Sequence, residues 1–186
     1  MWTPSSLVQH KKLTLYANFH ALLQKRRVLI FYSFKRRNYY CCSSWYGSLT
    51  VALKERLNVL QRKMIRFIHG LEYRAHVDGK NLKDLSWLSI PDRVRFFRMS
   101  HLFRVRHKLA PAYLMPNFKS ISEAHSHNTR GSAHNFVLNR ELSLSQTGFA
   151  FQAIKQWNDL PNDIKSIKVF RVFKRKLKEF FISQYD

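Results

Sequence analysis

Apolar residues recur at helical spacing along several stretches of the chain. From about Leu49 to His69 they return every three or four residues, which is the pattern of an amphipathic helix with one buried stripe. Gly70 follows directly and suits the left-handed conformation that ends many helices. The residues expected to face inward are Leu49, Leu53, Leu57, Leu60, Met64 and Phe67.

A second helix is predicted to begin near Pro91 and to end at Ala110-Pro111. Proline fits a first helical turn, Ser89 can cap it, and Asp92 suits the positive end of the helix dipole. The expected inward residues are Val94, Phe97, Leu102, Val105 and Leu109. The expected exterior is basic, with Arg93, Arg95, Arg98, Arg104, Arg106 and Lys108. A short helical turn is predicted just upstream, from Leu82, Leu85, Trp87 and Leu88.

Two more helices are predicted, one from Phe149 to Trp157 and one from Lys168 to about Ser183, the latter capped by Ser166. The apolar stripe of the last helix is Phe170, Phe173, Leu177 and Phe180. Its exterior carries Lys168, Arg171, Lys174, Arg175, Lys176 and Lys178. Residues 120–135 are rich in Ser, His and Asn, which is typical of a loop, and residues 136–138 are compatible with a short strand or hairpin. The sequence therefore predicts a mainly α fold, a small bundle of amphipathic helices with a loop-rich middle segment.

The charge balance changes the picture most. The chain has 33 Lys and Arg against 11 Asp and Glu, a formal net charge of +22. Such a protein repels itself, so we expect a polyanionic partner, nucleic acid before an anionic membrane surface. No apolar run approaches the ~20 residues that span a bilayer. With 45% hydrophobic residues the chain also has enough apolar side chains for a packed core.

Reactive groups do not converge in the sequence. It lacks the Asp-Asp pair that two-metal polymerases and nucleases use, and Asp159 and Asp163 are separated by Pro161, which breaks a helix. We therefore expect no catalytic site, no cofactor and no small-molecule substrate.

Histidine and cysteine leave two weaker alternatives. His125, His127 and His134 lie beside Glu123, and a metal-assisted nuclease could use them, although a polar loop without a ligand is favoured. The two cysteines are adjacent, which excludes a disulfide scaffold and a zinc knuckle. Cys41 and Cys42 are expected to pack beside Trp45 rather than to act in redox chemistry. No metal site is predicted.

Several segments, taken together and in order, resemble a known family. They are Tyr40-Cys41-Cys42 followed by Trp45-Tyr46-Gly47, then Leu60-Gln61, Trp87-Leu88, His127-Asn128-Thr129-Arg130, Trp157-Asn158-Asp159-Leu160-Pro161 and Phe173-Lys174-Arg175-Lys176-Leu177-Lys178. Over roughly residues 39–183 this pattern resembles the thumb and post-thumb region of reverse transcriptases of non-LTR (LINE-type, jockey-like) retrotransposons. The resemblance implies a C-terminal fragment without the catalytic palm, the fingers or an endonuclease domain.

That resemblance implies three regions and a function. Residues 1–38 are a basic extension that matches nothing, residues 39–70 a partial thumb-like helical segment, and residues 71–186 a post-thumb helical domain. The expected protein is not an enzyme. It binds RNA or DNA through phosphate contacts with weak sequence preference. The expected contact residues are Arg62, Lys63, Arg66, Arg95, Arg98, Arg130, Lys174, Arg175 and Lys178. Trp157 and Leu160-Pro161 are expected in the core instead.

An alternative function remains open at this point. The first forty residues contain bases and no acid, which is also typical of a mitochondrial import sequence. In that case the chain would be a basic organellar, ribosome-associated RNA-binding protein, and its mature N-terminus would lie near residue 40. The resemblance favours a nuclear or cytoplasmic ribonucleoprotein. It also favours self-association, because apolar stripes that once met a palm domain would be exposed.

Overall fold

The computed structural model describes residues 42–124, 134–138 and 148–185. In chain order the elements are α2 (Cys42–Trp45), η1 (Tyr46–Ser48), α3 (Val51–His69), α4 (Gly79–Asp84), α5 (Ile90–Arg106), η2 (Ala112–Asn117), α6 (Ile121–Ala124), α7 (Phe149–Asn158), α8 (Asn162–Lys165) and α9 (Phe170–Ile182). This confirms the mainly α prediction. The described residues fall into two compact units, a smaller one with Arg62–His76 and a larger one with the rest.

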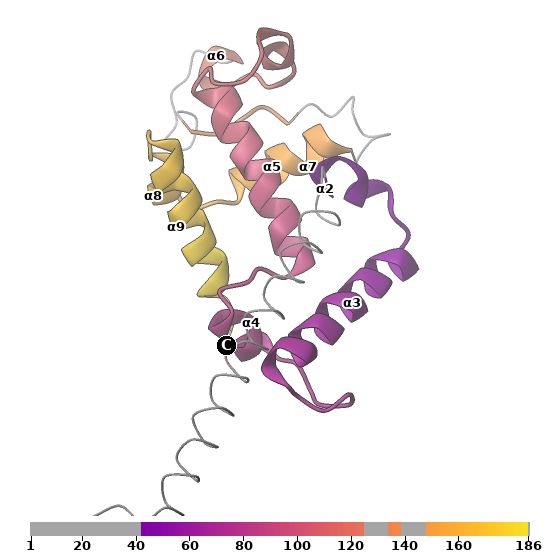
Figure 1. Ribbon diagram of the computed structural model, residues 1–186. Helices are drawn as coiled ribbons and strands as arrows, with labels where there is room; N and C mark the ends of the chain where they lie inside the picture. The colour runs from indigo at the N-terminus through magenta and orange to yellow at the C-terminus, as the bar shows by residue number, and fades with distance from the viewer. Residues whose placement is uncertain (1–41, 125–133, 139–147, 186) are drawn as a thin grey trace, which may run out of the picture. The chain divides into compact units, whose positions relative to one another are not determined.

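The core of the larger unit lies where α5 packs against α7 and α9 (Figure 1). Leu102 and Phe103 of α5, Trp157 of α7, and Phe173 and Leu177 of α9 are completely buried. The rings of Phe103 and Phe173 stack with centroids 4.5 Å apart. The predicted core positions of Trp157 and Leu160 are thus confirmed, whereas Pro161 is exposed and its predicted core position is wrong. The rings of Phe103, Phe173 and Trp157 pack against one another.

The start of α5 agrees with the sequence prediction, and its end does not. At the start, the Ser89 hydroxyl accepts a hydrogen bond from the Asp92 amide at 3.2 Å, as the sequence predicts for a capped helix. The predicted end at Ala110-Pro111 and the inward position of Leu109 are wrong. The helix ends at Arg106 because Lys108 adopts a positive φ of 54°, and Leu109 then points outward, 61% exposed.

Tyr185, near the C-terminus, is hydrogen-bonded to the start of α5. The Tyr185 hydroxyl donates to an Asp92 carboxylate oxygen at 2.7 Å and accepts from the Ser89 amide at 2.8 Å. Burial of the ring, together with the bond to Asp92, raises the pKa of Tyr185 to about 12. A segment 93 residues away in sequence therefore completes the cap of α5.

This contact predicts a pH dependence of stability. The folded chain holds the tyrosine proton more tightly than the unfolded chain, whose tyrosines have a pKa of 10.0. The stabilisation is therefore complete below pH 10 and is lost as the pH rises to about 12. Urea unfolding across this window should show a steeper loss in the wild type than in Tyr185→Phe. Tyr113→Phe, at a ring that is 76% exposed, should behave like the wild type; equal pH profiles for all three chains would contradict this role.

Trp157 and Asn158 fix the segment of residues 134–138. The indole Nε1 donates to the His134 carbonyl at 2.8 Å. The Asn158 side chain accepts from the Phe136 amide at 3.0 Å and donates to the Phe136 carbonyl at 2.9 Å. Within the described residues no strand forms, and the expected strand or hairpin is reduced to one antiparallel bridge between Ser120 and Phe136. The Trp-Asn pair of the motif thus has a structural role here.

The cap predicted for the last helix is wrong. Ser166 closes α8 instead, where its amide donates to the Asn162 carbonyl at 2.9 Å. α9 begins after Val169 without a side-chain cap. It is held by its apolar stripe, because Phe173, Leu177 and Phe181 are buried while Phe170 and Phe180 are only half-buried.

The long helix α3 buries a different side from the one predicted. Gln61 is buried, with its side-chain amide donating to the Leu88 carbonyl at 2.9 Å and accepting from the Ile90 amide at 3.1 Å. These two bonds turn Gln61 inward and leave Leu53 and Leu60, two members of the predicted stripe, exposed. A single polar side chain therefore decides the orientation at this turn of the helix.

The self-association expected from exposed apolar stripes stays a prediction.

The smaller unit closes the end of α3 as the sequence predicts. Gly70 has a φ of 66°, the left-handed conformation, and the Leu71 amide donates to the Arg66 carbonyl at 2.9 Å. Arg66 Nε then donates to the Ala75 carbonyl at 2.7 Å. The helix end and the residues after it form one hydrogen-bonded turn. Ile65 and Ile68, near this end of α3, are buried.

Candidate nucleic-acid interface

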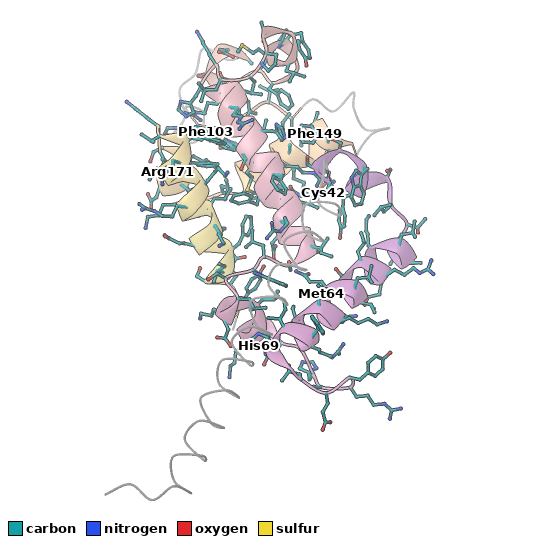
Figure 2. The ribbon with its side chains drawn as sticks, viewed as in Figure 1. Cys42, Met64, His69, Phe103, Phe149 and Arg171 are labelled. Atoms are coloured by element: carbon teal, nitrogen blue, oxygen red, sulfur yellow. The ribbon has the colours of Figure 1, made fainter. Side chains whose placement is uncertain are left out.

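Three of the five predicted contact residues that the structure describes in the larger unit lie on α9. The sequence of the helix, FRVFKRKLKEFFI, has one acid, Glu179, among its basic residues. The helical period that buries Phe173 and Leu177 leaves Lys174 and Arg175 exposed and Lys178 half-buried. Arg171, labelled in Figure 2, is exposed on the same helix. The predicted placement of these side chains on a helix exterior is confirmed.

Glu179 offsets part of this charge. Its carboxylate lies 3.9 Å from Arg175 Nε and 3.1 Å from Lys176 Nζ, and all three side chains are more than half exposed. Exposed ion pairs of this kind contribute little to stability and exchange readily with other anions. A phosphate can therefore compete for Arg175 at small cost.

Two cations flank an aromatic ring where α5 and α9 meet. Arg104 Cζ lies 4.8 Å from the ring centroid of Phe170, and Lys174 Nζ lies 5.5 Å from the same centroid. Lys174 also lies 6.0 Å from the ring of Phe96. Both cations are exposed, and both rings are half-buried. We name the surface formed by Arg104, Phe170, Arg171, Lys174, Arg175 and Lys178 the α5–α9 basic face.

Arg104 and Phe170 were not among the predicted contact residues. Each residue can be recognised by itself in the sequence: Arg104 is a cation on the exterior of one predicted helix, and Phe170 is an apolar residue near the start of another. Their pairing depends on how α5 packs against α9, which a single sequence does not specify.

Two predicted contact residues on α5 have different surroundings. Arg95 is half exposed and lies 3.6 Å from Asp92. Arg98 is only 4% exposed, so its predicted place on the basic exterior is wrong. The reason is the helical period, because Arg98 lies one turn after Val94 and one turn before Leu102, both buried. Burial lowers the pKa of its guanidinium.

The predicted thumb-like cations belong to the smaller unit. Lys63 is exposed, while Arg62 and Arg66 are half-buried. The bond from Arg66 Nε to the Ala75 carbonyl engages one of its donors in the turn after α3. Arg130 lies outside the described residues.

One observation bears on the alternative of a metal site at the three histidines. His134 Nδ1 lies 2.7 Å from a terminal nitrogen of Arg106 and, because that guanidinium only donates, acts as an acceptor. Desolvation and the Arg106 charge lower the pKa of His134. His125 and His127 lie outside the described residues, and in the residues that the structure describes no three metal-ligating side chains gather.

Cys42 is buried and packs at the start of the larger unit, as expected for a structural thiol (Figure 2). Burial raises its pKa to about 11, which keeps the sulfur protonated and unreactive at neutral pH. Cys41 lies outside the described residues.

Comparisons with known proteins add no assignment: no family model, no curated protein and no solved structure matches this chain. Among the described helices, none is both long and apolar enough to cross a membrane.

Proposed function

We propose that this chain is a non-catalytic fragment of a retrotransposon reverse transcriptase, without polymerase activity of its own, that binds RNA or DNA through phosphate contacts. The observation that carries the proposal is the α5–α9 basic face. There, exposed cations from two helices gather around a partly exposed aromatic ring, with Glu179 as the acid of α9. The ordered motifs that resemble the thumb region support the same proposal.

The chemistry of this face suits a phosphate backbone better than a specific base sequence. Lysine and arginine on a helix exterior neutralise phosphates and release condensed counterions, which gives affinity without sequence information. A half-buried ring such as Phe170 offers a surface on which an unpaired base can stack. The formal net charge of +22 adds long-range attraction to any polyanion.

The proposal is tested by the salt dependence of binding. Fluorescence anisotropy of labelled single-stranded RNA and of duplex DNA, both of mixed sequence, should show binding by the full chain at low salt. The observed association constant should fall with a log–log slope of about −0.9 per phosphate neutralised on duplex DNA and about −0.7 on single strands. A folded chain that binds neither polymer in dilute buffer would contradict the proposal.

A further inference from the structure

A second feature of the larger unit is a polar pocket of about 240 Å³ beside the first half of α5. A single water needs only about 10–15 Å³, so the pocket has room for a polyatomic ligand. Its walls come from the segment around η1 and the first turn of α3, from α5, and from α7. We name it the Arg98 pocket; its polar lining residues are Tyr46, Lys54, Arg95, Arg98, Gln152 and Gln156.

Arg98 gives the pocket an uncompensated buried donor. Its side chain is 4% exposed, and within the described part of the chain its Nε has no hydrogen-bond partner. A guanidinium stays charged at any ordinary pH, so this is a buried positive charge. The neighbouring cation Arg95 increases the electrostatic cost further. Buried charges are normally paired, and an unpaired one is strongly unfavourable.

Gln156 supplies an acceptor on the wall formed by α7. Its Oε1 is buried and has no hydrogen-bond partner among the described residues, while its Nε2 lies 3.5 Å from Gln152 Oε1. Lys54 brings a further positive charge, 5.5 Å from the centroid of the Tyr46 ring. The pocket therefore presents several donors and cations together with Gln156 Oε1, a buried acceptor that has no hydrogen-bond partner among the described residues.

We propose that the Arg98 pocket binds a phosphate group, with Arg98, Arg95 and Lys54 opposing its charge and Gln156 Oε1 accepting its remaining proton. Inorganic phosphate keeps a proton at neutral pH, and a terminal phosphate of a nucleic-acid strand keeps one near pH 6. A phosphodiester inside a strand carries no such proton. The ligand is therefore free phosphate or a strand end, and the proposal stands independently of the α5–α9 basic face.

The first test is calorimetric titration of the full chain with inorganic phosphate at about pH 6. Saturable binding is expected, and sulfate, which has the same shape but no proton, should bind at least about tenfold more weakly because it faces Gln156 Oε1 without a donor. Absence of saturable phosphate binding, or sulfate binding as tight as phosphate, would overturn the proposal.

Three substitutions test whether phosphate binds in the Arg98 pocket. Arg98→Met removes the buried charge at similar length and should weaken phosphate binding by about tenfold or more. Lys54 is half-exposed, so we expect the Lys54→Gln variant to fold like the wild type. It should weaken phosphate binding by about threefold. Lys80→Gln removes the same charge from an exposed position on α4 and should stay within about twofold of the wild type. If Arg98→Met does not fold, Lys54→Gln decides, and a result indistinguishable from Lys80→Gln overturns the site.

A second titration distinguishes the two sources of phosphate. An oligonucleotide with a 5′-phosphate is compared with the same strand ending in a 5′-hydroxyl. Tighter binding of the phosphorylated strand that disappears in Arg98→Met and is reduced in Lys54→Gln supports a strand end as the ligand, whereas equal binding of the two strands supports free phosphate. A chain that binds free phosphate and neither oligonucleotide supports the pocket while contradicting the function proposed for the α5–α9 basic face.

Discussion

Replacing Lys174, Arg175 and Lys178 together with glutamine should reduce the log–log salt slope of duplex DNA binding by about three. Each of these side chains lies on the outer side of α9, where it can neutralise one phosphate and release about one counterion. Loss of the contacts should weaken binding uniformly across sequences, because phosphate contacts carry no sequence information. Anisotropy titrations at several salt concentrations measure both quantities.

A matched control removes the same charge elsewhere in the larger unit. Lys80, Lys83 and Lys155 are exposed on α4 and α7, two helices that contribute no residue to the α5–α9 basic face. Their combined replacement with glutamine should lower the affinity slightly through net charge and leave the slope nearly unchanged. If both triple variants flatten the slope equally, binding is diffuse over the whole surface and the α5–α9 basic face has no special part in it.

Trp157→Ala should destabilise the fold by about 3–5 kcal/mol, the largest effect expected of a single substitution here. The indole is completely buried against Phe136 and Phe173, and its Nε1 hydrogen bond holds the His134 carbonyl. The substitution leaves a cavity and removes the donor that fixes residues 134–138. Urea unfolding followed by circular dichroism measures the change.

The control for this prediction is an aromatic residue at the surface. Tyr113 is 76% exposed, so Tyr113→Ala should change the free energy of unfolding by no more than about 0.5 kcal/mol. Comparable stabilities for Trp157→Ala and the wild type would show that the core does not depend on this ring. The structural role of the Trp-Asn motif would then be wrong.

The sequence predicts best what depends on neighbouring residues. The start of α5 follows from Ser89, Pro91 and Asp92, and the end of α3 follows from Gly70, because caps and left-handed glycines act within one turn. The buried ring of Trp157 was also predictable, since a large aromatic residue within an amphipathic helix has few other favourable positions.

What the sequence does not predict depends on contacts between distant segments. The buried side of α3 is decided at Gln61 by the backbone of residues 88 and 90. Tyr185 completes a helix cap 93 residues upstream. In the sequence Arg98 resembles the exterior cations of α5, but in the fold it lines a pocket together with residues of η1, α3 and α7.

The candidate interface also has a part that the sequence predicts and a part that depends on contacts between distant segments. The cations of α9 were predicted because their spacing relative to Phe173 and Leu177 fixes the side on which they lie. The contribution of Arg104 and Phe170 arises from the approach of α5 to α9 and could not be predicted from either segment alone. The resemblance to the thumb region implies nucleic-acid contacts by basic helices, but it does not specify this junction.

The central claim, that the α5–α9 basic face contacts a phosphate polymer, is tested most directly by lysine acetylation of the folded chain with and without saturating RNA, read out by mass spectrometry. Lys174 and Lys178 should be protected by RNA, and Lys80, Lys83 and Lys155 should stay as reactive as in the free chain. Equal reactivity of Lys174 and Lys178 in the two conditions would contradict the account.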